Sequence, residues 1–131
     1  MTKELIISII IVVLIFVGNA FTENYTNESV KEATQSLEKL REELIKDEDE
    51  IDANIAKEKV DEIYEKWNIR HEKLAYYIEH DELEKVKTEL TGLRGYIEQE
   101  EYSEAVPELD KSVYILEHIK DKTALKLKNI F

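Results

Sequence analysis

An uninterrupted apolar run stands near the start of the chain. The segment LIISIIIVVLIFVGNAF, residues 5–21, has one hydroxyl group, on Ser8, and no charged side chain. As a helix it spans roughly 25 Å at about 1.5 Å per residue. A bilayer core of about 30 Å accepts such a helix if it stands nearly upright. Because the run is apolar on every face, it is not typical of a core helix in a soluble domain, and it predicts a transmembrane anchor over residues 1–21.

The same run also has the length of a signal-peptide core, and residues 18–20, GNA, have the small-x-small form of a cleavage site. The start of the chain is only weakly basic, since Glu4 partly offsets Lys3 and the amino terminus. This favours a retained anchor over secretion after cleavage near Ala20. Both alternatives give the same sidedness, because no lysine or arginine follows the run before Lys31. The positive-inside rule then places the rest of the chain outside the cytoplasm.

Beyond the run, the hydrophobic pattern changes to that of amphipathic helices. The polar segment TENYTNES, residues 22–29, has no periodicity and predicts a short linker. After it, apolar residues recur mostly at spacings of three and four, which is typical of helices with one buried face. Four such stripes follow one another: Val30, Ala33, Leu37, Leu40 and Leu44; Ile55, Val60, Ile63, Trp67, Leu74 and Ile78; Leu83, Val86, Leu90, Leu93 and Ile97; Ala105, Leu109, Val113, Leu116 and Ile119.

Polar residues mark the expected boundaries of these helices. The second helix is expected from near Asp52 to about His80, and the third begins at Asp81 as a capping residue. The fourth begins near Ser103 and has Pro107 in its first turn, where a missing N–H costs little.

The pattern as a whole predicts an all-α fold. A transmembrane or signal-anchor helix (1–21) precedes a linker (22–29) and an antiparallel bundle of about four amphipathic helices (30–131), because short connections force neighbouring helices to run antiparallel. Three glycines and one proline are too few for a turn-rich β fold. Gly92 and Gly95 within the third helix either permit close helix approach or soften the helix, and the sequence does not separate these alternatives.

The net charge of the chain limits the classes of partner that it can bind. The chain has 30 acidic and 18 basic residues and a net charge of −12. Such a field repels phosphate groups, so we expect no nucleic-acid partner and no bundle lying flat on a membrane. It favours cations or basic partners. The chain has no cysteine, which removes disulfides, thiolate nucleophiles and cysteine-type zinc sites.

The acidic run at 47–52 invites a calcium interpretation, since carboxylates supply the oxygen ligands that Ca²⁺ prefers. The EF-hand pattern fails, however, because Ile51 stands at the fifth position and Asp52 stands where glycine is required. The run is therefore interpreted as a solvated loop.

The three histidines do not form a recognisable catalytic pattern. His71 follows Trp67 by one turn and is interpreted as a core or boundary histidine. His80 and His118 would form a metal site only if the second and fourth helices met there. Without a phosphate loop or a nucleophile elbow, the sequence predicts no enzyme, no cofactor and no metal site.

Short motifs spread over the whole chain point to a known family. They are Trp67 in the middle, IEHDEL (78–83), LRGYIE (93–98), LEHI (116–119) and the terminal NIF (129–131). Together with the apolar N-terminal helix, the chain resembles small bacterial proteins, mostly from Firmicutes, that are known only as domain of unknown function 4363. The resemblance implies a membrane-anchored helical protein on the outer face, without established activity. It also hints at a membrane partner, since such proteins look to be encoded often beside small integral-membrane proteins.

These observations predict an interaction module that docks an envelope or integral membrane protein. Aromatic side chains dominate protein interfaces, and Tyr76 and Tyr77, adjacent and so facing different directions, are the candidate contacts on the second helix. The tail, residues 123–131, is expected as a short fifth helix or a strap, and its Ile130 and Phe131 are further candidate contacts. The alternative function is a sensor that binds a small ligand or cation in a pocket near His71.

Overall fold

The chain folds almost entirely into helices. The computed structural model describes residues 1–130, with side chains to residue 125. Its elements are α1 (Thr2–Leu44), a 3-10 turn η1 (Glu48–Glu50), α2 (Ala53–Leu74), α3 (His80–Glu98) and α4 (Tyr102–Ile130). The described residues contain no strand, and the all-α prediction is confirmed.

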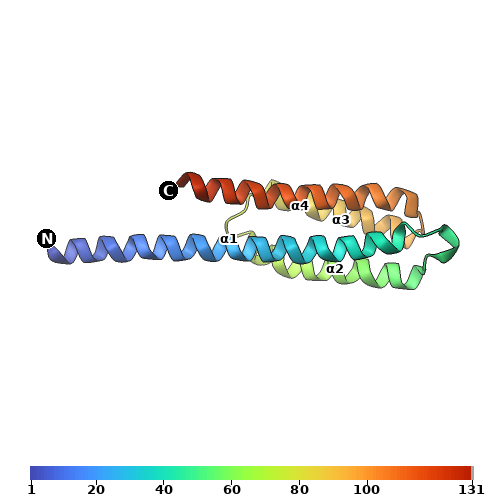
Figure 1. Cartoon of the computed structure of the whole chain (residues 1–131), viewed down its shortest axis with the longest axis horizontal. Helices are drawn as coiled ribbons and strands as arrows, with labels where there is room; N and C mark the ends of the chain where they lie inside the picture. Colours follow the sequence, from blue (N-terminus) through green and yellow to red (C-terminus); the bar gives the residue numbers. More distant parts are fainter. Residues whose placement is uncertain (131) are drawn as a thin grey trace.

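The four helices form an antiparallel bundle. Each of α1, α2 and α3 packs against the next helix in the chain, and α4 packs back against α1, whereas the backbones of the diagonal pairs do not approach each other closely within the described residues. The α1–α2 and α3–α4 connections therefore lie at one end of the bundle, and the α2–α3 turn lies at the other (Figure 1). The N-terminal part of α1 projects far beyond that second end, and the last part of α4 extends beyond it by a shorter length.

The predicted stripes form the core between the helices. All five stripe residues of α1 and all five of α3 are buried. Three positions of the other two stripes differ. Ile55 is 39% exposed while Ala56 is buried in its place, Ile78 is only partly covered, and Ser112 is buried beside the only partly covered Val113. The Ser112 hydroxyl donates to the Glu108 carbonyl at 2.9 Å, so its burial leaves no unmet hydrogen bond.

The prediction of a linker at 22–29 is wrong, because α1 continues through this segment without a break. Polar side chains of this segment form hydrogen bonds within the helix or are buried in the bundle. The hydroxyls of Thr26 and Ser29 donate to carbonyls one turn earlier, at 2.8 and 2.7 Å, and both residues are buried. Buried hydroxyls on the inner face interrupt the hydrophobic pattern without interrupting the helix.

Several helix ends also differ from the prediction. Asp52 does cap α2, accepting from the N–H groups of Asn54 and Ile55 at 3.0 and 3.2 Å. However, α2 ends at Leu74 rather than near His80. The fourth helix begins at Tyr102, so Pro107 lies beyond its first turn, inside the helix.

The tail forms neither a fifth helix nor an extended strap, since α4 continues to Ile130.

The two glycines of α3 are not explained by close helix packing. A Cβ atom at Gly95 would meet nothing within 4 Å, and one at Gly92 would lie at an ordinary 3.6 Å from Glu108 Oε2. Of the two alternatives, the structure thus disfavours close helix approach.

Candidate functional site

The histidines and the acidic run do not assemble a metal centre in the described part of the chain, where no group of three or more histidine or acidic side chains is placed to hold an ion. His80 and His118 are both exposed, and His80 lies 3.8 Å from Glu84 on its own helix. His71 is partly buried on α2, and its Nδ1 atom is enclosed without a hydrogen-bond partner in the described residues.

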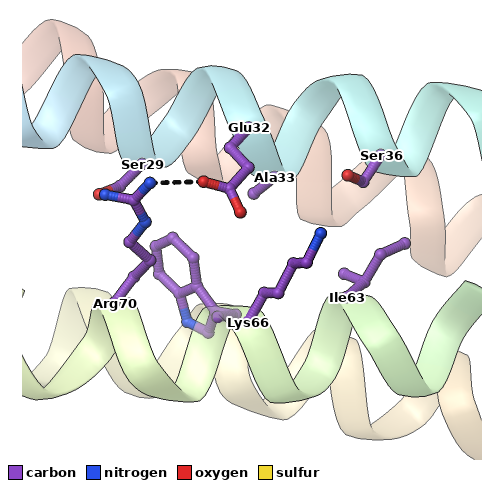
Figure 2. A pocket seen from close by; sticks show the side chains of 8 residues that line it. Ser29, Glu32, Ala33, Ser36, Ile63, Lys66 and Arg70 are labelled. Carbon is purple, nitrogen blue, oxygen red and sulfur yellow. Dashed lines mark hydrogen bonds and ion pairs between the residues drawn. The ribbon is translucent and has the colours of Figure 1, made fainter.

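A small pocket lies between α1 and α2 on the side of Trp67 (Figure 2). Arg70 of α2 reaches across to the Glu32 carboxylate of α1, and Ser29 and Lys66 lie beside this ion pair. The free volume is about 10 Å³, roughly the room that one water needs. The pocket near His71 that a ligand sensor requires is therefore not supported here.

The end of the bundle nearest the apolar helix is held together by aromatic and charged contacts. The ring of Tyr25 on α1 carries Arg70 at 5.1 Å and Lys73 at 5.6 Å from α2. On the other side, Lys122 of α4 bonds Glu82 at 3.0 Å, and this bond lowers the pKa of the Glu82 carboxyl. These contacts join α1 to α2 and α3 to α4 at this end of the bundle.

The two candidate tyrosines differ sharply in this region. Tyr76 lies in the α2–α3 turn and is 89% exposed, as a docking residue should be. Tyr77 instead faces inward: its hydroxyl shares a 2.8 Å hydrogen bond with Thr26 and donates to the Thr22 carbonyl at 3.2 Å. Burial raises the pKa of the Tyr77 phenol. Tyr77 therefore fixes the turn onto α1, and Tyr76 remains available to a partner.

The other two candidate contacts lie at the end of α4. Ile130 is its last helical residue, and its side chain and Phe131 lie outside the described residues. The helix places residue 130 on the same side of the molecule as the projecting part of α1 (Figure 1).

The opposite end of the bundle carries a cleft that sequence reasoning missed. It has a volume of about 750 Å³ and lies between the α1–α2 loop and the α3–α4 turn. Its lining combines carboxylates, tyrosines and aliphatic side chains: Leu44, Lys46, Glu48, Ile51, Tyr96, Glu100, Glu101, Tyr102, Ser103, Glu104 and Val106. The sequence does contain a signal that could have predicted this cleft. The first and third connections of an up-down bundle lie at the same end, and both connections are acidic in this chain.

Buried hydrogen bonds hold the loop beside this cleft in place. Glu43 of α1 is only 7% exposed at its side chain, and it accepts from the Asp52 N–H at 2.9 Å and from Lys46 at 2.6 Å. These donors lower the pKa of the Glu43 carboxyl, the Lys46 bond most. The loop is thus bonded at both of its ends to Glu43 of α1 and forms one wall of the cleft.

Comparison with known protein families gives a match over most of the chain. The family model described as Domain of unknown function (DUF4363) matches residues 20–130. No curated protein and no solved structure shows significant similarity to the chain. The match covers the bundle and most of the chain, and the chain therefore belongs to the DUF4363 family.

Proposed function

We propose that this protein is a membrane-anchored docking module whose bundle stands outside the cytoplasm and binds an envelope or integral membrane protein. The observation that carries the proposal is the unbroken helix α1, which joins an exposed apolar segment to the bundle.

The apolar segment has the properties of a membrane span. Residues 5–17 are apolar except for Ser8, and the apolar ones each expose between 46% and 64% of their surface. In water such exposure is unfavourable, whereas each leucine, isoleucine, valine or phenylalanine favours the bilayer centre by about 0.3–0.6 kcal/mol. The Ser8 hydroxyl donates to the Glu4 carbonyl at 2.8 Å, which lowers its cost in lipid.

The direct connection between span and bundle favours docking over loose tethering. A flexible linker would let the bundle tumble, whereas a continuous helix holds it at one orientation to the membrane. The inward bonds of Tyr77 and the cations over Tyr25 reinforce this connection. Tyr76 is consequently held near the membrane surface, where the side chain can meet a membrane protein.

The sidedness follows from the basic residues. Lys3 precedes the span, and no lysine or arginine follows it before Lys31. The positive-inside rule keeps the amino terminus in the cytoplasm and the bundle outside. If the span is retained, the intact mass of the chain from the membrane fraction is that of all 131 residues. A chain that begins at Phe21 would instead show that the signal is cleaved.

Photo-crosslinking in intact cells tests the docking role. Benzoylphenylalanine replaces Tyr76, and in a control chain it replaces Glu65, which is exposed in the middle of α2. We expect Tyr76 to yield a discrete adduct with a membrane protein that the Glu65 position does not yield. Identical adducts from both positions, or adducts with lipid alone, would contradict the proposal.

A further inference from the structure

The fold brings two acidic segments together at the end of the bundle farthest from the apolar helix. They are the α1–α2 loop, residues 45–52, and the α3–α4 turn with the helix ends beside it, residues 98–104, which both lie at the right-hand end of Figure 1. Together they contain nine acidic residues and one lysine. Most of the net charge of −12 is therefore concentrated at this end, around the cleft.

The carboxylates at the cleft are not neutralised by the chain itself. Glu48, Glu100, Glu101 and Glu104 line the cleft and form no ion pair with a described lysine or arginine. The one lysine, Lys46, is held by Glu43. Like charges at this density repel one another and lower the stability of the end that carries them. A cationic partner would remove that repulsion.

The backbone adds a cost at one of these positions. Glu100 follows α3 with a φ of 59°, the left-handed conformation in which helices usually place glycine. A residue with a Cβ atom costs roughly 1 kcal/mol there. Despite this cost, the chain has the carboxylate of Glu100 and not a glycine at this position beside the cleft.

The lining also offers surfaces that suit the stems of long cationic side chains. Leu44 is buried, and Ile51, Tyr96, Tyr102 and Val106 are partly buried. Tyrosine faces attract guanidinium and ammonium groups, as Arg94 over Tyr64 at 5.0 Å already shows elsewhere in this chain. The volume of about 750 Å³ lies within the range of ligand-binding clefts.

The arrangement suits several separate cationic groups better than a single metal ion. No three acidic or histidine side chains of the described residues converge as ligands, and the carboxylates come from both connections around the cleft. Another copy of this chain is a poor occupant, since its own net charge is −12. Arginine and lysine side chains meet dispersed carboxylates one by one.

We propose that this cleft binds an arginine- or lysine-rich segment of the partner protein. The inference deepens the proposed function by giving the docking module a second contact, at the membrane-distal end. In this arrangement Tyr76 meets the partner near the membrane, and the cleft holds a basic segment of its extracytoplasmic part.

Binding of a defined peptide to the full-length protein tests the cleft. The protein is held in nanodiscs of zwitterionic phosphatidylcholine, and the probe is a fluorescent peptide of alternating arginine and serine. A matched peptide carries uncharged citrulline in place of arginine. We expect the arginine peptide to bind with an affinity that falls as salt is raised, and the citrulline peptide not to bind. Absence of binding by the arginine peptide at low salt would overturn the inference.

Two charge-matched variants separate the cleft from general attraction to an acidic protein. The cleft variant carries Glu48→Gln, Glu100→Gln, Glu101→Gln and Glu104→Gln. The control variant neutralises four exposed carboxylates elsewhere: Glu28→Gln, Glu38→Gln, Glu65→Gln and Glu72→Gln. We expect affinity to fall at least about tenfold in the first and less than about threefold in the second. Equal losses in the two variants, each with a wild-type thermal melt, would overturn the inference.

The outcomes also separate this inference from the proposed function. A discrete adduct at Tyr76 together with equal losses in the two variants would reject the cleft and leave the docking role intact. Loss of peptide binding only in the cleft variant, without any adduct at Tyr76, would support the cleft and contradict membrane-proximal docking.

Discussion

Tyr76 and Tyr77 are neighbours in sequence with opposite environments, and this contrast leads to a prediction for single residues. Tyr77→Phe removes the hydroxyl that bonds Thr26 and the Thr22 carbonyl. We expect the free energy of unfolding to fall by about 1 kcal/mol, the usual net value of such a bond. Tyr76→Phe, on an exposed side chain, should change it by less than about 0.5 kcal/mol. Urea unfolding of both variants in mild detergent measures the difference, and equal effects would contradict the inward role of Tyr77.

A second pair of residues makes the free energy of unfolding depend on pH. The carboxyl groups of Glu89 on α3 and Glu108 on α4 can form a hydrogen bond when one of them is protonated, and this pairing raises the pKa of Glu89 and lowers that of Glu108. Glu89 Oε2 is buried and has no hydrogen-bond donor among the described residues, and we expect a proton shared with Glu108 to satisfy it. A raised folded pKa of Glu89 means that its contribution is present at low pH and is lost as the pH rises through that value. The lowered pKa of Glu108 acts in the opposite sense, so the pair is most favourable with one proton bound.

Glu89→Gln supplies a permanent donor to Glu108 and removes this dependence. We expect the variant to be more stable than the wild type by about 1 kcal/mol at about pH 8 and nearly equal to it at about pH 5. Glu38→Gln, on an exposed side chain, is the control and should not alter the pH profile. Chemical unfolding at the two pH values measures this, and an unchanged profile in Glu89→Gln would argue against a shared proton.

Among the elements, α1 decides how the bundle is presented. In the proposed arrangement, residues 22–44 of α1 rise about 35 Å above the end of the membrane span, at about 1.5 Å per residue. A short glycine-serine insertion after Ala20 should leave the protein in the membrane but reduce the mean height of the α1–α2 loop, because the bundle can then tilt. An alanine insertion of equal length keeps the helix and should preserve the height. Energy transfer from a dye at Asp49 to acceptors in the lipid measures the height, and equal values for both insertions would contradict a stiff connection.

The helices were predictable from the sequence to different degrees. The stripes of α1 and α3 were identified because leucine, valine and alanine repeat at helical spacing, and burial follows that repeat. The extension of α1 through residues 22–29 was not predictable in the same way. Thr26 and Ser29 are polar and therefore typical of a linker in the sequence, and only the structure shows that their hydroxyls are buried within the bundle. The end of α2 at Leu74 was missed because Ile78 continues the apolar spacing into the turn.

The candidate site was predictable only in part, for a related reason. Exposure of Tyr76 and burial of Tyr77 depend on how the α2–α3 turn docks against α1, which a linear pattern does not contain. The distal cleft arises from two connections that are far apart in sequence and meet only in the bundle. Each acidic run alone looks like a solvated loop, and the cleft exists only through their combination.

At the scale of the whole molecule, the two ends of the bundle have different chemistry. One end continues into an apolar helix and carries tyrosines and basic residues around α1. The other carries most of the net negative charge and a cleft. A protein with this polarity, placed upright in a membrane, presents its acidic end away from the lipid and avoids repulsion by anionic headgroups.

The central claim is that α1 crosses the membrane and holds the bundle outside the cytoplasm. Because the chain has no cysteine, single cysteines report topology without background. The account predicts that a membrane-impermeant maleimide labels Gln35→Cys, at an exposed position of the bundle, in intact cells, and labels Thr2→Cys only after permeabilisation. Labelling of Thr2→Cys alone in intact cells, or recovery of both variants in the soluble cytosolic fraction, would contradict it.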